Sequence, residues 1–210
     1  MIFKKTVLAA FAVFTLTSGV SQAQNLVQNG SFEANSQASG TWNIYSSLTG
    51  WTGSPNIELR NNVAGSAQDG VNYVELDTTR NSSMFQDIMA GGLVELSFWY
   101  SARPGNFGLV NSTNELDFSF GSLAGTVLSS ASNLSGANQW HRYTGTVDLG
   151  GYGAHRLTFA ADGYSNSYGG SLDNISVTAV PEPETYAMML AGLGLMGTIA
   201  RRRKQKLQNV

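Results

Sequence analysis

Residues 93–101 read Leu-Val-Glu-Leu-Ser-Phe-Trp-Tyr-Ser and alternate between apolar and other side chains. A period of two places alternate side chains on opposite faces of a β-strand. The stretch therefore predicts a strand with one face toward a core. The core parity holds Val94, Leu96, Phe98 and Tyr100, and the other parity holds Glu95, Ser97, Trp99 and Ser101.

The same alternation recurs on both sides of this strand, between segments rich in Gly, Asn, Ser and Thr. No ten-residue segment from 24 to 179 has a helical period, so about ten strands are expected. They predict one all-β ectodomain over residues 24–179, a two-sheet jelly-roll β-sandwich, with an up-and-down barrel as the alternative. Trp140 is expected in its core. The other predicted inward positions are Leu116, Phe118 and Phe120, then Leu157 and Phe159, and Ile57 and Leu59, which alternate with Asn56 and Glu58.

The charge of the ectodomain is strongly negative. Residues 24–179 hold five Arg, no Lys and twelve acids, a net charge of −7. Such a surface repels a phosphate backbone, so nucleic acid is not an expected partner, whereas a neutral glycan or a divalent cation suits it. The chain has no Cys, which excludes zinc–thiolate, iron–sulfur and cysteine-nucleophile chemistry.

The first 23 residues have the features of a secretory signal peptide. Lys4 and Lys5 precede an apolar run from Val7 to Leu16, and Ser21-Gln22-Ala23 is a small-x-small cleavage site. We therefore expect a signal helix and cleavage between Ala23 and Gln24. An anchor that is never cleaved is the alternative.

The C-terminal region has three parts in order. Val180-Pro181-Glu182-Pro183-Glu184 is followed by an uncharged run at 186–200 and by Arg201-Arg202-Arg203-Lys204. As a helix the run spans only ~22 Å, short of the ~30 Å hydrocarbon core. It predicts a marginal transmembrane helix, with the basic cluster and residues 205–210 on the cytoplasmic side.

This order of parts resembles the PEP-CTERM sorting signal of Gram-negative bacteria, also catalogued as an ice-binding protein C-terminal domain. The resemblance covers residues 180–204. It implies recognition by exosortase, a membrane protease, with cutting near Pro181-Glu182-Pro183, and it implies roles for Arg201, Arg202 and Arg203 in sorting. It further implies transient membrane anchoring, then release to a cell surface or an exopolysaccharide biofilm matrix. An ordinary tail anchor is the alternative.

The ectodomain is similar to the galactose-binding-like β-sandwich group, which includes many carbohydrate-binding modules. The likeness rests on the opening segment 26–33, Gly50-Trp51-Thr52, the segment 70–77 (Gly-Val-Asn-Tyr-Val-Glu-Leu-Asp) and the closing segment 172–177. It implies a binding fold and names no ligand.

Two carboxylates are candidates for a structural calcium site. Asp173 shares parity with Ile175 and Val177 and is expected to face inward, where a carboxylate must be paired or bound to a metal. Glu33 is expected at the end of the first strand. The resemblance implies that Glu33, Asp173 and nearby carbonyls hold Ca²⁺, an ion that prefers oxygen ligands. The alternative is that both carboxylates accept backbone N–H bonds or pair with Arg.

Six aromatic residues are candidate glycan contacts, because sugar rings stack on exposed aromatic faces. The alternative for each is packing in the core or at an edge. The candidates are Trp42, Tyr45, Trp51, Trp99, Tyr164 and Tyr168.

Catalysis is not expected. Each of the two His, His141 and His155, sits beside an Arg in a predicted strand, and the common hydrolase and metalloprotease motifs do not occur. The sequence thus predicts a non-enzymatic surface protein that binds extracellular polysaccharide. A structural matrix or adhesion protein without a sugar pocket is the first alternative, and a glycan-active enzyme with a carboxylate pair is a remote one.

Overall fold

The computed structural model describes residues 24–104, 114–127, 136–181 and 183–208. The predicted signal peptide, with Ala23, lies outside these residues, as does Glu182 of the sorting tail. In the described ranges the chain forms ten strands followed by one helix, which confirms the all-β prediction. The elements are β1 (Thr41–Leu48), β2 (Trp51–Asn61), β3 (Asn72–Glu75), β4 (Ser83–Ala90), β5 (Leu93–Ser101), β6 (Leu116–Phe120), β7 (Leu123–Val127), β8 (His141–Asp148), β9 (Gly153–Ala161), β10 (Ser171–Ala179) and α1 (Pro183–Gln208).

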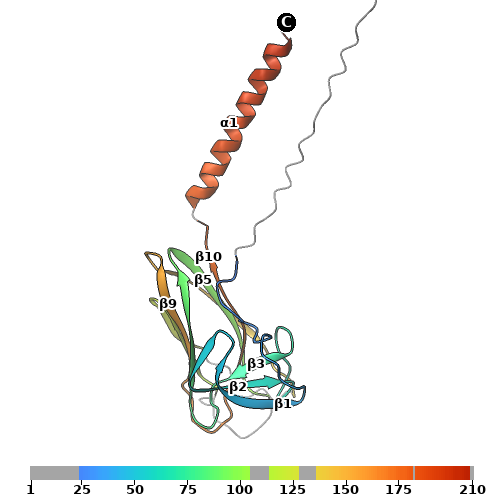
Figure 1. The fold of residues 1–210 in the computed structure, drawn as a ribbon, viewed down its shortest axis with the longest axis vertical. Helices are drawn as coiled ribbons and strands as arrows, with labels where there is room; N and C mark the ends of the chain where they lie inside the picture. Colours follow the sequence, from blue (N-terminus) through green and yellow to red (C-terminus); the bar gives the residue numbers. More distant parts are fainter. Residues whose placement is uncertain (1–23, 105–113, 128–135, 182, 209–210) are drawn as a thin grey trace, which may run out of the picture.

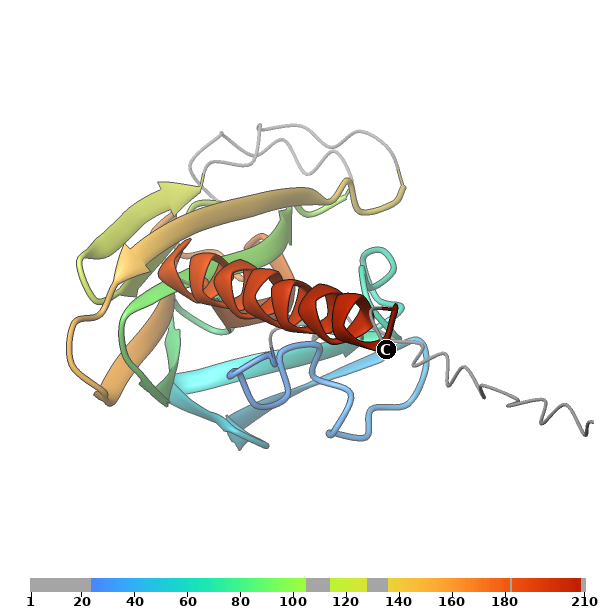
Figure 2. The same cartoon turned by 90° about the horizontal axis from the view of Figure 1, so that it is seen from above.

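The strands form two layers that share β2. The hydrogen-bonded order is β7-β6-β9-β4-β2-β3-β10-β5-β8, with β1 also paired to β2. The first part of β2, Thr52 to Ser54, pairs with β4, and its last part, Glu58 to Asn61, pairs with β3. The strand therefore passes from one layer to the other, and the layers face each other around the core (Figures 1 and 2). The sandwich prediction is confirmed, with a continuous ladder through β2 that makes it barrel-like.

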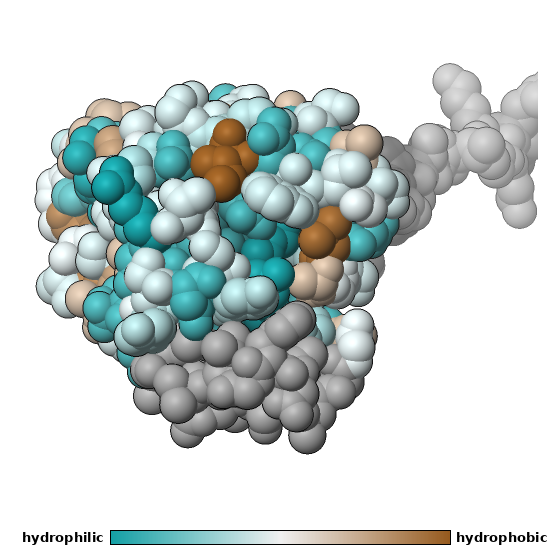
Figure 3. Space-filling view, turned by 90° about the horizontal axis from the view of Figure 1, so that it is seen from below, coloured by the Kyte–Doolittle hydropathy of each residue, from teal (hydrophilic) through white to brown (hydrophobic). Residues whose placement is uncertain are grey.

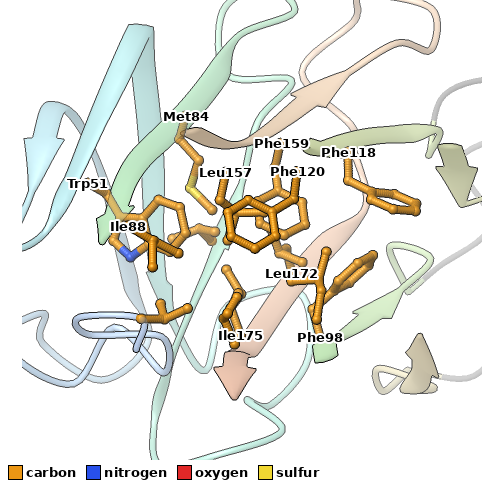
Figure 4. Close-up of a cluster of buried hydrophobic side chains, with 14 of the residues drawn as sticks. Trp51, Met84, Ile88, Phe98, Phe118, Phe120, Leu157, Phe159, Leu172 and Ile175 are labelled. Carbon is orange, nitrogen blue, oxygen red and sulfur yellow. The ribbon is translucent and has the colours of Figure 1, made fainter. Parts of the chain in front are cut away.

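The core lies between the layers and is rich in aromatic rings (Figure 4). The Phe98 ring centroid is 5.0 Å from that of Phe159, and the Trp51 centroid is 6.2 Å from it. The predicted inward parity is confirmed, except that Tyr100 is half-buried. The predicted core positions that are buried are Ile57, Leu59, Val94, Leu96, Phe98, Leu116, Phe118, Phe120, Leu157 and Phe159.

A bulge in β10 reverses the predicted orientation of Asp173. The pairing of β10 with β5 shifts register between Asp173 and Ser176, and Asn174 takes a left-handed φ of 47°. The extra residue places Leu172 in the core with Ile175, although their parity differs. The prediction that Asp173 faces the core is wrong: its carboxylate lies on the outer face, buried beneath the loop that holds Gln68.

The opening segment lies beside β10 without forming a regular strand, so the predicted first strand is absent from the described residues. The Leu26 amide donates to the Val177 carbonyl at 2.8 Å, and the Ile175 amide donates to the Gly30 carbonyl at 3.0 Å. A Cβ at Gly30 would lie 2.0 Å from the Ile175 oxygen, so this approach requires glycine. The first and last segments of the sandwich are therefore neighbours.

Helix α1 leaves the sandwich after β10 and extends away from it (Figure 1). It covers 26 residues, and it begins and ends outside the predicted 186–200. Among the described residues, no helix combines the length and the apolar character that a membrane crossing requires. Seven large apolar side chains on α1 are exposed: Met188, Met189, Leu190, Leu193, Leu195, Met196 and Ile199.

Candidate functional site

The outer face of β1 and β2 carries a polar cluster above the core. Because Ile57 and Leu59 point inward, Glu58 and Arg60 point to the opposite face. In the β1–β2 register, Trp42 lies opposite Arg60. An aromatic ring thus stands beside a guanidinium on one face of the sheet.

Arg60 is the centre of a buried ion-pair network. Its Nε donates to the Glu58 carboxylate at 2.5 Å, and its Nη2 donates to the Glu75 carboxylate at 3.1 Å. The three residues are at most 6% exposed. The third nitrogen, Nη1, is buried and has no hydrogen-bond partner within the part of the chain that the structure describes. The guanidinium is therefore held through Nε and Nη2, and its Nη1 nitrogen is left without a partner among the described residues.

Burial raises the pKa of Glu75 to about 8, against the lowering effect of Arg60 and with a further rise from Glu58 and Asp77. The Glu75 Oε1 atom accepts the Gly169 amide at 2.8 Å, and the Asp77 carboxylate accepts the Asn166 amide at 2.9 Å. These two acids on one side of the network fix the loop between β9 and β10.

A pocket of about 170 Å³ opens over this network. Arg103 forms part of its wall: the guanidinium carbon lies 4.6 Å from the centre of the Tyr168 ring, and Nη1 donates to the Ser167 carbonyl at 2.9 Å. Burial lowers the pKa of Arg103 from its ordinary value. The residues that line the pocket include Trp42, Glu58, Arg60, Thr78, Arg103 and Ser167.

The pocket combines fixed donors, a fixed carboxylate acceptor and an apolar ring. Trp42 is 53% exposed, whereas Arg60 beside it is 1% exposed. Guanidinium and carboxylate groups held in one place can bond neighbouring hydroxyls, and an indole face can stack on the C–H face of a sugar ring. Its volume is below the roughly 300–1,000 Å³ of pockets for drug-sized ligands, which suits one ring of a longer chain.

The structure brings two of the six predicted aromatic residues to this pocket. Trp42 lines it, and Tyr168 supports Arg103 from outside. Tyr164 is 69% exposed on the loop that precedes β10 and does not line it. Trp99 is half-buried on β5, opposite Asp173 and Arg142 in the neighbouring strands.

Two of the remaining aromatic candidates belong to the core. The prediction that Trp51 contacts a ligand is wrong, because its side chain is 2% exposed and its indole donates to the Asn29 carbonyl at 3.1 Å. Tyr45 packs against the core and donates its hydroxyl to Gln37 at 3.1 Å. Trp140, predicted as core, is instead half-buried on the outer face, edge-on to Tyr73 at 6.0 Å.

The calcium candidates Glu33 and Asp173 both bind backbone amides of one loop. Asp173 Oδ2 accepts the amides of Gln68 at 2.8 Å and Asp69 at 2.9 Å, and Glu33 Oε1 accepts the amide of Val71 at 2.9 Å, at the end of the same loop. Burial raises the pKa of Asp173 to about 7, and these amide donors oppose the rise.

Backbone N–H donors thus bind both carboxylates, which is the alternative that the sequence left open to a metal. No group of three or more His, Cys, Asp or Glu that could hold a metal occurs among the described residues. Calcium at Glu33 and Asp173 stays a prediction.

Sequence reasoning did not identify the residues that build the pocket, Glu58, Arg60, Glu75 and Arg103. The available signal was parity, since Glu58 and Arg60 alternate with core residues. Parity shows that Glu58 and Arg60 lie on the outer face of β2. It does not reveal that β1 and the loop that holds Ser167 cover this face.

A second hollow of about 340 Å³ lies over β6, β7 and β9. Its lining is mostly Ser, Thr, Ala and Gly, and Asp117, its one charged member, accepts the Thr126 hydroxyl at 2.5 Å. Within the described ranges, no Trp, Tyr, Arg or His lines this hollow, so these residues offer a sugar fewer specific contacts than the pocket beside Trp42.

Residues 179–204 match the PEP-CTERM protein-sorting motif, which confirms the predicted sorting tail and implies an exported protein. Of the tail residues with predicted roles, Arg201 is exposed at the helix surface. The side chains of Glu182, Pro183, Arg202 and Arg203 lie outside the described part.

Among solved structures, the chain resembles carbohydrate-binding modules. TmCBM61, solved with beta-1,4-galactotriose, is 14% identical over 75% of this chain and 100% of its own, with a TM-score of 0.49. A family 16 module is 12% identical over 74% and 100%, with a TM-score of 0.46. A family 35 module from Clostridium thermocellum is 14% identical over 67% and 100%, with a TM-score of 0.41. No curated protein matches the sequence.

Proposed function

We propose that this is an exported surface protein whose ectodomain binds an extracellular polysaccharide in the pocket beside Trp42. The observation that carries the proposal is the juxtaposition of an exposed indole with a buried guanidinium–carboxylate pair. Trp42 and Arg60 are opposite each other in the β1–β2 register, and Glu58 holds the Arg60 Nε at 2.5 Å.

Rigidity of the polar groups supports this function. Binding costs free energy when it must order flexible side chains. This cost is small for a hydroxyl-rich ligand when other contacts already hold the donors and acceptors of the site in place. Arg60 is held by two carboxylates, and Arg103 is held by the Tyr168 ring and the Ser167 carbonyl. Trp42, in contrast, is 53% exposed at the rim, where its indole face can stack on a sugar ring.

Processing by an exosortase-type membrane protease is the second part of the proposal. The motif at 179–204 supports it, and the exposed apolar side chains of α1 need a lipid or protein environment outside the described chain. The protein would be held at the inner membrane of a Gram-negative cell by this tail until processing, and then reach the cell surface or matrix.

Binding of the purified full-length chain to a panel of neutral and acidic polysaccharides tests the glycan site. We expect Trp42→Ala to lower the affinity about two- to tenfold, since an aromatic stacking contact contributes about 0.5–1.5 kcal/mol. Tyr164→Ala is the matched control, because Tyr164 is exposed and does not line the pocket. Equal affinity of both variants and the wild type would place the glycan elsewhere.

A structural matrix or adhesion role is the second candidate. It is favoured by the fact that Trp42 is the only Trp or Tyr among the residues that line the described pocket, and by the pocket's small volume. Absence of binding to every polysaccharide in the panel, with a folded wild-type protein, would favour this role over a glycan-binding one.

A further inference from the structure

Three chain segments meet at the end of the sandwich from which the tail leaves. The Gly92 amide in the β4–β5 turn donates to the Gly150 carbonyl in the β8–β9 turn at 2.7 Å, and the Leu149 amide donates back to Gly92 at 2.9 Å. The Val180 amide, directly after β10, donates to the Leu93 carbonyl at 2.9 Å. Hydrogen bonds therefore join the two turns and the start of the tail at one end of the sandwich. Helix α1 leaves the sandwich at this end (Figure 1).

This surface exposes large apolar side chains. Met89 is 52% exposed, Leu93 is 42% exposed and Tyr152 is 77% exposed. They are three of the six exposed large apolar residues in the described ectodomain. We call Met89, Leu93 and Tyr152 the turn-end patch.

The β4–β5 and β8–β9 turns pack closely at this end of the sandwich. A Cβ at Gly91 would lie 2.7 Å from the Tyr152 nitrogen, so glycine allows the two turns to touch. In contrast, the end of the molecule opposite α1 is mostly polar, with isolated apolar residues (Figure 3). Apolar exposure on the ectodomain is therefore concentrated beside the tail.

We propose that the turn-end patch rests on the headgroup layer of the membrane that holds the sorting tail, until the tail is processed. The inference depends on the proposed tail insertion. Only Val180, Pro181 and Glu182 separate the end of β10 at Ala179 from the start of α1 at Pro183. The four steps from Ala179 to Pro183 reach about 14 Å at most, so a membrane-bound helix keeps this end of the sandwich near the lipid surface.

The chemistry of the patch suits a lipid surface. Tyrosine is enriched at membrane interfaces, where its ring is apolar and its hydroxyl stays wet. Three side chains around glycine turns form no groove and are far smaller than the roughly 800 Å² per partner of a stable protein interface. A bilayer needs no shape complementarity, so it is the occupant that this surface fits.

The contact is apolar and not electrostatic. Charged groups near the patch include Asp148, whose carboxylate accepts the Gly150 amide at 2.8 Å, the Asp87–Arg156 pair at 2.7 Å, and Glu95, two residues from Leu93 on the same face of β5. These groups give the patch no excess positive charge, and the ectodomain has a net charge of −7. Binding through this end should therefore be insensitive to salt, unlike binding through a basic patch.

Site-directed spin labelling tests the proposal, because the natural chain has no Cys. The full-length variants Tyr152→Cys, Tyr164→Cys and Leu193→Cys are labelled with a nitroxide and reconstituted in vesicles of phosphatidylcholine and phosphatidylglycerol. Collision with oxygen and with a water-soluble nickel chelate then reports the depth of each label. Leu193 on α1 reports tail insertion, and Tyr164, on the loop before β10, is the exposed ectodomain control.

We expect the Tyr152 label to be several-fold less accessible to nickel than the Tyr164 label, at low and at high salt. Adding Met89→Ser and Leu93→Ser should return the Tyr152 label to the control value. If the Leu193 label is buried in lipid while the Tyr152 label is as accessible as the control, the patch does not touch the membrane. If the Leu193 label is itself in water, tail insertion fails and the patch proposal falls with it.

Discussion

Replacing Arg60 with Met should strongly destabilise the ectodomain. Arg60 is 1% exposed and contacts Glu58 at 2.5 Å and Glu75 at 3.1 Å. Met has a similar length and no charge, so Arg60→Met removes the cation and leaves two buried carboxylates. Breaking a buried ion pair in this way costs about 3–5 kcal/mol of unfolding free energy.

The loss should depend on pH with a definite sign. In the folded wild type the pKa of Glu75 is raised from 4.5 to about 8 by burial. Folding therefore favours the protonated carboxyl: its contribution to stability is complete below about pH 4.5 and is lost as the pH rises through about 8. Arg60 lowers this pKa, so its removal raises the pKa of Glu75 further. The loss should therefore approach about 3–5 kcal/mol only at about pH 10, where the wild-type Glu75 is ionised beside Arg60, and should be much smaller at about pH 6, where Glu75 is protonated in both proteins.

Urea unfolding of the full-length chain, followed by circular dichroism at both pH values, measures these differences. Arg142→Met is the matched control, because the Arg142 guanidinium is 3.9 Å from Glu95 and both side chains are at least 41% exposed. Such a pair contributes less than about 1 kcal/mol. Adding Glu58→Gln and Glu75→Gln to Arg60→Met should restore most of the lost stability. A loss from Arg60→Met as small as the control's, or one of equal size at both pH values, would refute the reasoning.

Three further perturbations have expected outcomes. Asp173→Ala removes the carboxylate that accepts the partly buried amides of Gln68 and Asp69 and should cost about 1–3 kcal/mol in urea unfolding, with or without chelator. A melting temperature that falls with chelator only when Asp173 is present would instead support calcium. Gly30→Ala places a Cβ 2.0 Å from the Ile175 oxygen and should cost more than about 2 kcal/mol, whereas Gly136→Ala, in open space, should be near neutral. Replacing Pro181-Glu182-Pro183 by Ala should leave the tail uncut in the native host; an immunoblot with the mature mass would count against exosortase processing.

The fold class could be predicted because alternation is a local property. In β5, residues 94, 96 and 98 face the core as their parity requires, and the same holds for β6 and β9. The sorting tail could be predicted for a related reason, since its three parts are contiguous in sequence. Both features require no knowledge of which strands become neighbours.

The parts that could not be predicted depend on contacts between distant segments. The bulge at Asn174 changes the face of Asp173, and the sequence carries no sign of it beyond a residue type that tolerates left-handed φ. Trp51 is in a Gly- and Ser-rich segment without clear alternation, and it enters the core because the start of β2 pairs with β4. Burial of Arg60 likewise requires Glu75 from β3, 15 residues away.

The candidate pocket and the tail lie at opposite ends of the same strands. β5 begins at Leu93, which binds Val180 at the tail exit, and ends at Ser101, two residues before Arg103 of the pocket wall. Eight steps along a strand span ~26 Å. With the turn-end patch on a membrane, the pocket would face away from the lipid at about this height, above the headgroup layer. A polymer outside the membrane could therefore reach Trp42 both before and after the tail is cut, so glycan binding and tail processing should be independent of each other.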